Sequence, residues 1–163
     1  MGFSTSEVEI PMRISAKGEY AAKAVLYLSL KYPGIVTIHE VAQRHRIPVK
    51  YLEHILLSLK KAGLLESRRG VRGGYLLARH PQQISIGEVL RVVDGKFSES
   101  SCIEVDLKNH YACPEIDSCG LRQVWQDVQS AVEKILFQTT FDEVRKRTLA
   151  GVARKSDYTA FEI

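Results

Sequence analysis

Cysteine is scarce in this sequence, and long apolar runs are missing from it. The 163 residues include three cysteines, and hydrophobic residues make up 45% of the chain. An odd number of cysteines, with no basic and apolar leader in residues 1–11, argues against a secreted disulfide scaffold. No apolar run approaches the roughly 18 residues of a membrane-spanning helix. We therefore expect a cytoplasmic protein with reduced cysteines and no membrane partner.

Recognisable catalytic motifs are also missing. The sequence has no phosphate-binding glycine loop, no catalytic triad and no second set of cysteines. An enzyme or an iron–sulfur electron carrier is therefore a disfavoured alternative, and we expect a protein without catalytic residues.

Charge is distributed unevenly, although the formal net charge is only +4. Residues 37–80 contain nine Lys or Arg against three Asp or Glu, whereas residues 97–119 contain five Asp or Glu against one Lys. The first of these segments therefore suits a polyanion such as double-stranded DNA, and the second does not.

Three helices are predicted before residue 63. Ser15 can cap a helix over residues 15–31, and Thr37 with Glu40 has the spacing of a capping box that starts a short second helix. After a turn at residues 46–48, a third helix is expected to end at Gly63 and to bury Val49, Leu52, Ile55, Leu56 and Leu59. Its outward residues are then Lys50, Tyr51, Glu53 and His54. Such a pair of short helices is typical of a helix-turn-helix, although a plain solvated helix face is the alternative.

A glycine-rich hairpin is predicted directly after these helices. Residues 64–69 and 75–78 are expected to form two strands around the turn Gly70–Gly74. Arg68, Arg69 and Arg72 surround its tip, where glycines allow close approach to DNA and arginines suit phosphates or a narrow minor groove. The hairpin is therefore interpreted as the wing of a winged helix, with an ordinary solvated hairpin as the alternative.

A long amphipathic helix is expected near the end of the chain. Ser85 and Glu88 have the spacing of a capping box at the start of a helix that ends at Gly95. In a later helix, which begins at Gly120, apolar residues recur at steps of three and four. They are Leu121, Val124, Trp125, Val128, Val132, Ile135 and Leu136. A partner subunit is the expected cover for this stripe. Thr140 is expected to cap a last short helix that ends at about Leu149.

The predicted fold class is mainly α with a small β-hairpin wing, a winged helix-turn-helix followed by a long dimerisation helix. We expect a disordered extension over residues 1–11 and the DNA-binding domain over residues 12–95. A cysteine-containing, cluster-binding loop follows at residues 96–119. The dimerisation helix and a short C-terminal helix are assigned to residues 120–149, and a loosely ordered tail to residues 150–163.

The three cysteines lie in that loop with the spacing C-x10-C-x5-C, at Cys102, Cys113 and Cys119. Zinc modules use closer cysteine pairs, so zinc fits this spacing poorly. Iron–sulfur clusters accept wider spacings, and three thiolates would leave one position for another donor. Three ordinary cysteines are the remaining alternative.

Several segments resemble one family of regulators. Residues 12–21, 51–56, 69–77 and 86–90 look like the IscR/NsrR/CymR family of bacterial winged-helix transcription regulators, over about residues 12–136. The resemblance implies a homodimer that binds operator DNA. It implies a base-reading role for Glu53. It also implies that the three cysteines hold a [2Fe-2S] or [4Fe-4S] cluster.

The family resemblance leaves the fourth cluster ligand open. Where IscR-like members have a histidine three residues after the last cysteine, this chain has Arg122. An acidic residue from the first helix, as in NsrR, would be Glu19, and His110 inside the loop is the rival. Since members such as CymR act without a cluster, the family-level alternative is a clusterless regulator signalled by thiol oxidation or a protein partner. Our hypothesis is a repressor controlled by a cluster that senses iron, redox state or nitric oxide.

Overall fold

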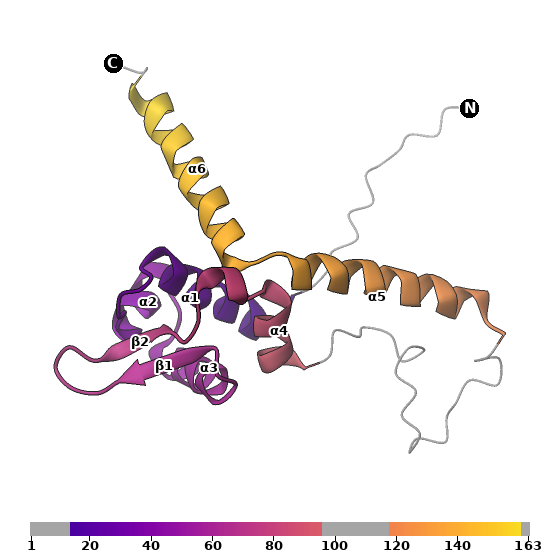
Figure 1. Cartoon of the computed structure of the whole chain (residues 1–163), viewed down its shortest axis with the longest axis horizontal. Helices are drawn as coiled ribbons and strands as arrows, with labels where there is room; N and C mark the ends of the chain where they lie inside the picture. Colours follow the sequence, from indigo (N-terminus) through magenta and orange to yellow (C-terminus); the bar gives the residue numbers. More distant parts are fainter. Residues whose placement is uncertain (1–13, 96–117, 161–163) are drawn as a thin grey trace.

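The computed structural model describes residues 14–95 and 118–160, with side chains as far as Arg154. These residues form six α-helices, one 3-10 helix and one two-stranded sheet (Figure 1). In chain order they are α1 (Ala16–Leu30), α2 (Ile38–His45), α3 (Val49–Lys61), β1 (Leu65–Arg68), β2 (Gly74–Leu77), η1 (Pro81–Gln83), α4 (Ile86–Asp94), α5 (Gly120–Gln138) and α6 (Phe141–Ala160). The expected fold class, mainly helical with a hairpin wing, is confirmed.

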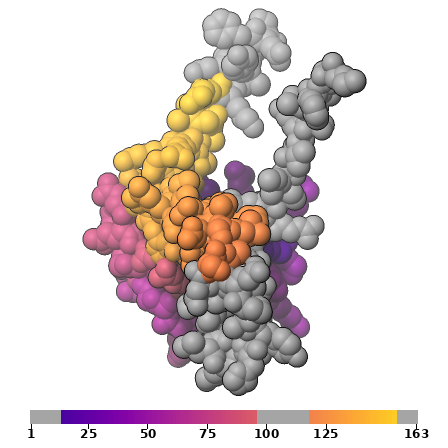
Figure 2. Space-filling model, turned by 90° about the vertical axis from the view of Figure 1, so that its right-hand side faces the viewer, coloured from indigo at the N-terminus to yellow at the C-terminus, as the bar shows by residue number. Residues whose placement is uncertain are grey.

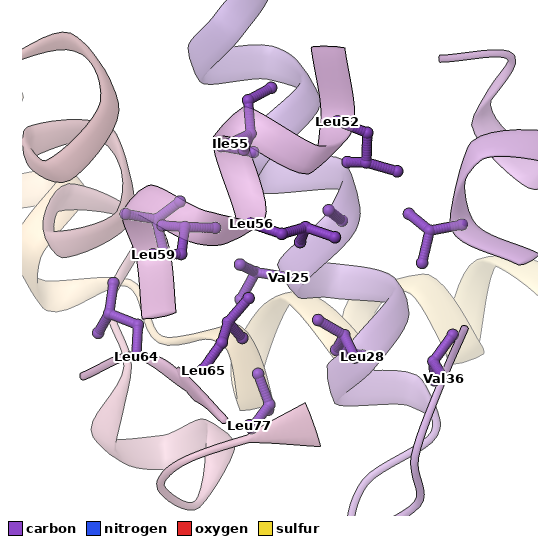
Figure 3. Packing of buried hydrophobic residues seen from close by; sticks show 14 of the residues in the cluster. Val25, Leu28, Val36, Leu52, Ile55, Leu56, Leu59, Leu64, Leu65 and Leu77 are labelled. Atoms are coloured by element: carbon purple, nitrogen blue, oxygen red, sulfur yellow. The ribbon is translucent and has the colours of Figure 1, made fainter. Parts of the chain in front are cut away.

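The hydrophobic core joins α1, α3, α4 and the hairpin (Figure 3). Leu52, Ile55, Leu56 and Leu59 are fully buried on one face of α3. They pack with residues of α1 such as Val25, and burying each large side chain contributes about 1.5–3 kcal/mol. Val49, expected in this face, is instead 37% exposed, because it occupies the first turn of α3, at the edge of the core.

Side-chain caps start the helices at the expected residues. Ser15 Oγ accepts from Gly18 N–H at 2.8 Å, and Ser85 with Glu88 forms a complete capping box. Thr37 Oγ1 accepts from Glu40 N–H at 3.2 Å, but the Glu40 carboxylate accepts from Tyr27 Oη at 2.8 Å. The predicted capping box at Thr37 is therefore only half formed, because a side chain of α1 engages the glutamate.

The hairpin is antiparallel, and its strands occupy nearly the predicted residues. Leu65 pairs with Leu77 and Arg68 with Gly74, so the strands lie within one residue of their predicted bounds. A β-bridge between Val36 and Tyr75 attaches β2 to the segment before α2. This bridge ties the wing to the helix-turn-helix instead of leaving it an isolated hairpin.

Helices α5 and α6 extend in different directions from the part of the molecule formed by α1 to α4 and the hairpin (Figure 1). No residue of α5 is buried, and in Figure 2 this helix points toward the viewer in front of the other elements. Helix α6 continues past Leu149 to Ala160, so it is longer than the short helix predicted there, and it includes residues 150–160 of the predicted tail. Gly151 lies inside α6, but one helical glycine costs only about 1 kcal/mol and good helix formers flank it. Over residues 14–95 and 118–160, no helix has the length and apolarity needed to cross a membrane.

Candidate functional site

One face of α3 carries four exposed side chains, which we call the reading face: Lys50, Tyr51, Glu53 and His54. They alternate with the buried Leu52, Ile55 and Leu56, so the 3.6-residue period of the helix separates the two faces. The four residues predicted to face outward are therefore all accessible, and they share one helix. Such a face can supply donors and an acceptor to base edges and phosphates.

A tight turn at residues 46–48 connects α2 to α3. Arg46, which ends α2, has a left-handed backbone with φ of 54°. The next residue, Ile47, is buried and its N–H donates to Ala42 O at 3.0 Å. Pro48 then precedes the first turn of α3. The turn is thus anchored by an apolar side chain, and it fixes the angle between α2 and α3.

The reading face is supported by residues that the sequence pattern did not reveal. The Tyr20 ring of α1 meets the Tyr51 ring edge-on, with centroids 5.8 Å apart. Burial raises the pKa of Tyr75, and the negative charge of Glu53 on α3 raises it further. Both relations join residues far apart in the chain, so no local spacing could have predicted them.

The wing carries the arginines Arg68, Arg69 and Arg72, all exposed. We call them the wing arginines. Gly73 N–H donates to Gly70 O at 2.8 Å, and a side chain at Gly73 would meet Arg68 O at 2.5 Å. Lys60 Nζ of α3 donates to Ser67 Oγ of β1 at 2.6 Å. The wing is thus held beside α3, and the glycines of its tip allow the backbone to approach a polyanion closely.

A partly buried histidine lies beneath the turn between α2 and α3. The His45 ring meets the Tyr27 ring edge-on at 5.7 Å, and its Nε2 is buried without a hydrogen-bond partner. Burial lowers the pKa of His45, and the positive charges of Lys23 and Arg44 lower it further. The site therefore favours neutral imidazole.

The predicted cluster ligands are only partly described. Cys102, Cys113 and His110 lie outside the described residues. Cys119 is half-buried and is the N-cap of α5, and its side chain makes no capping hydrogen bond. A helix N-terminus stabilises a negative group such as a bound thiolate. In the parts of the chain with assigned positions, no group of three potential metal ligands occurs, but those parts include only one of the three cysteines.

Glu19 is an exposed carboxylate in the first turn of α1, where it pairs with Lys23 at 2.5 Å. The same end of α1 is fastened to the end of α4. Ser15 Oγ donates to Asp94 Oδ1, and Lys17 Nζ donates to Val93 O, both at 2.6 Å. Glu19 is therefore close to the turn of α1 that is fastened to the end of α4.

Comparison with known proteins finds one family. The sequence pattern of the Rrf2 family, described as an iron-dependent transcriptional regulator, matches residues 14–147. The HTH-type transcriptional regulator IscR of Pectobacterium atrosepticum is 32% identical over 148 residues, which are 90% of this chain and 87% of that protein.

Two solved structures have the same fold. CymR, the global cysteine regulator of B. subtilis, is similar with a TM-score of 0.69 and 30% identity, over 84% of this chain and 98% of that one. IscR of T. potens is similar with a TM-score of 0.68 and 30% identity, over 84% and 88% of the two chains.

The environment of His45 predicts a pH dependence of stability. Its folded pKa is lowered, so the unfolded chain takes up a proton first as pH falls. We expect stability to decline as pH falls below about 6.5, and His45→Gln to reduce that decline. Urea unfolding between about pH 7.5 and 5.5 measures it, with the exposed His54→Gln as control. An identical pH profile for His45→Gln and the wild type would contradict this prediction.

Proposed function

This chain belongs to the Rrf2 family of transcriptional regulators. We propose that it is a cytoplasmic, homodimeric repressor whose affinity for operator DNA is controlled by an iron–sulfur cluster. The observation that carries the proposal is the joint exposure of the reading face and the wing arginines. A helix and a hairpin that both present polar or basic side chains fit a duplex groove and its phosphates.

Each part of the DNA-binding surface has its own role in this proposal. Helix α3 enters the major groove, where Lys50 and Tyr51 hold phosphates and His54 contacts the duplex. Glu53 accepts a hydrogen bond from a cytosine amino group. The wing arginines contact phosphates or the narrow minor groove. A carboxylate near phosphates is unfavourable without such a base contact, so Glu53 should reject most sequences.

Substitution of Arg69 should therefore change the overall affinity for DNA, whereas substitution of Glu53 should change the preference for particular bases. Arg69→Ala should weaken binding to every sequence and reduce the salt slope by about 1, because one phosphate contact is lost. Glu53→Ala should relax base preference and leave non-specific affinity equal or higher. Fluorescence anisotropy with operator and random duplexes at several salt concentrations measures both.

Arg154→Ala on α6 is the matched control, because this arginine is exposed on a helix that leads away from α3 and the wing (Figure 1). It should leave binding unchanged. Loss of binding to all duplexes in Glu53→Ala would mean that this carboxylate has a structural role.

The dimer part of the proposal rests on α5. Leu121, Val124, Trp125, Val128 and Ile135 on this helix are between 42% and 64% exposed. An apolar stripe along a helix of 19 residues is more than isolated surface hydrophobics, and it favours burial against a second copy. Two copies related by a twofold axis would also match the symmetry of palindromic half-sites.

Charges in the middle of this stripe should prevent dimerisation. Val128→Asp with Val132→Asp would bury unpaired carboxylates, which costs several kcal/mol. Light scattering should show monomers, and operator affinity should fall with them. Gln126→Asp with Ser130→Asp on the opposite face is the control and should remain dimeric. A stable dimer of the valine variant would exclude this helix face from the interface.

The candidate ligands offer donor atoms that suit an iron–sulfur cluster, namely three cysteine sulfurs and one carboxylate or imidazole. Cys119 is partly accessible at the start of α5, and a cysteine sulfur is the donor that iron–sulfur clusters take. Cys102 and Cys113 would supply two more thiolates, and Glu19 or His110 the fourth donor. When bound, the cluster would join the thiolates of residues 102–119 at one centre. Because this segment connects α4 to α5, its conformation would influence how the two α3 helices are spaced.

Cluster binding should require all three thiols. Each single Cys→Ala change should abolish or severely weaken iron retention after anaerobic reconstitution. Glu19→Ala should give a graded effect if Glu19 is the fourth ligand, with a shifted spectrum and faster loss in air, and His110→Ala tests the rival. Iron and sulfide per chain are counted for the wild type and all five variants.

Full iron occupancy in Cys113→Ala or Cys119→Ala would exclude this cysteine set as the cluster site. One zinc per chain without sulfide would indicate a structural metal instead. The similarity to CymR, a global cysteine regulator, favours a second candidate, a clusterless regulator signalled by thiol oxidation or a protein partner. That candidate predicts no retained metal and operator binding that changes on mild oxidation.

A further inference from the structure

A close contact fastens the end of α5 to the start of α4. A Cβ added at Gly87 would lie 2.7 Å from Cγ and Cδ2 of Phe137, closer than carbon atoms can pack. Gly87 is buried, and one turn further along α4 the guanidinium carbon of Arg91 lies 4.3 Å from the centroid of the same ring. We call Gly87, Arg91 and Phe137 the α4–α5 joint.

Backbone hydrogen bonds close the joint on its other side. Ile86 N–H donates to Thr139 O at 3.0 Å, and Phe141 N–H donates to Ile84 O at 2.9 Å. A β-bridge pairs Ser85 with Thr140 between these two bonds. The segment that follows α5 is therefore attached directly to the segment that begins α4. With the ring of Phe137 laid on Gly87, these contacts leave little freedom for the axis of α5.

The rest of α5 extends away from this joint. Of the described elements, α4 is the one with which α5 makes extensive contact, and the amino-terminal end of α5 lies farthest from α4 (Figure 1). A helix of 19 residues is about 28 Å long, so a tilt of about 10° at the joint moves its far end by about 5 Å. Small changes at Gly87 are thus amplified along the helix.

Helix α4 in turn packs on the elements that hold the reading face. It contacts both α1 and α3, and Val89 and Val93 belong to the same core as Leu52 and Ile55. The orientation of α5 relative to α4 is therefore also its orientation relative to α3. In a dimer joined through α5, that angle sets the distance between two reading faces.

We propose that the α4–α5 joint determines the operator half-site spacing that this regulator accepts, with Gly87 and Phe137 as positioning residues. The inference rests on the proposed dimeric, DNA-binding function. Half-sites recur at about one helical turn, about 34 Å, so a displacement of a few ångströms at the reading face alters which spacing fits. None of the three joint residues needs to touch DNA for this effect.

The test measures spacing preference with the full-length chain. A half-site is first selected from random duplex DNA with the wild type. Palindromes are then made in which the spacer grows or shrinks by one base pair at a time. Anisotropy titrations under identical anaerobic conditions give the affinity for each spacer, and light scattering checks that each variant remains a dimer.

Gly87→Ala should lower affinity for the wild-type spacer by about tenfold and move the optimum to another spacer, because the new Cβ displaces the ring. Phe137→Leu alone should broaden the preference, since the ring that sets the angle is gone. Gly87→Ala with Phe137→Leu should restore part of the wild-type optimum. Gly151→Ala is the matched control, because nothing lies within 4 Å of a Cβ added there.

Each outcome decides between a positioning and a merely structural role. An unchanged optimum in Gly87→Ala, or an equal loss of affinity for every spacer, would overturn the inference. If Gly87→Ala does not fold, Phe137→Leu decides, and an unaltered spacer preference in that variant overturns it. A wild-type dimer with a clear optimum that no joint variant moves would overturn only this inference. A wild type without any spacer optimum would overturn the proposed function together with it.

Discussion

Burial of one side of α3 is the constraint on which the rest of the molecule depends. Leu52, Ile55, Leu56 and Leu59 are withdrawn completely from solvent by α1, α4 and the hairpin. Since a helix has only one such side, Lys50, Tyr51, Glu53 and His54 must project outward together. The core and the reading face are thus two consequences of a single amphipathic pattern. Loss of the buried face would leave the reading face without a defined orientation, because core packing is what fixes the rotation of α3.

The elements that the sequence predicted well are those governed by local rules. Ser15 and Ser85 cap their helices, Gly63 has a left-handed backbone with φ of 73°, and the glycine-rich turn closes a hairpin within one residue of its expected bounds. Each depends on residues within a few positions of one another. The helix-turn-helix and its wing could therefore be derived from spacing alone, and the family match agrees with them.

The features that could not be derived are contacts between distant residues. Glu40 has capping-box spacing but accepts a hydrogen bond from Tyr27 of α1. Tyr20 supports Tyr51, and Phe137 lies on Gly87, without any local signal. Helix α6 is longer than predicted because a single interior glycine, Gly151, costs only about 1 kcal/mol and does not end the helix. The roles of the cysteines remain predictions from spacing and family.

The two connections between α4 and α5 act on opposite ends of α5. Phe137, near its last turn, is held by Gly87 at the start of α4. Its first residue follows Cys119, which closes the segment that begins after Gly95 at the end of α4. A restraint applied through that segment would therefore act at the first residue of α5, far from Phe137, where the helix is held on α4. Under the proposed function, the cysteines need not approach DNA to influence it, because a force at Cys119 would act on the α4–α5 joint through the whole length of α5.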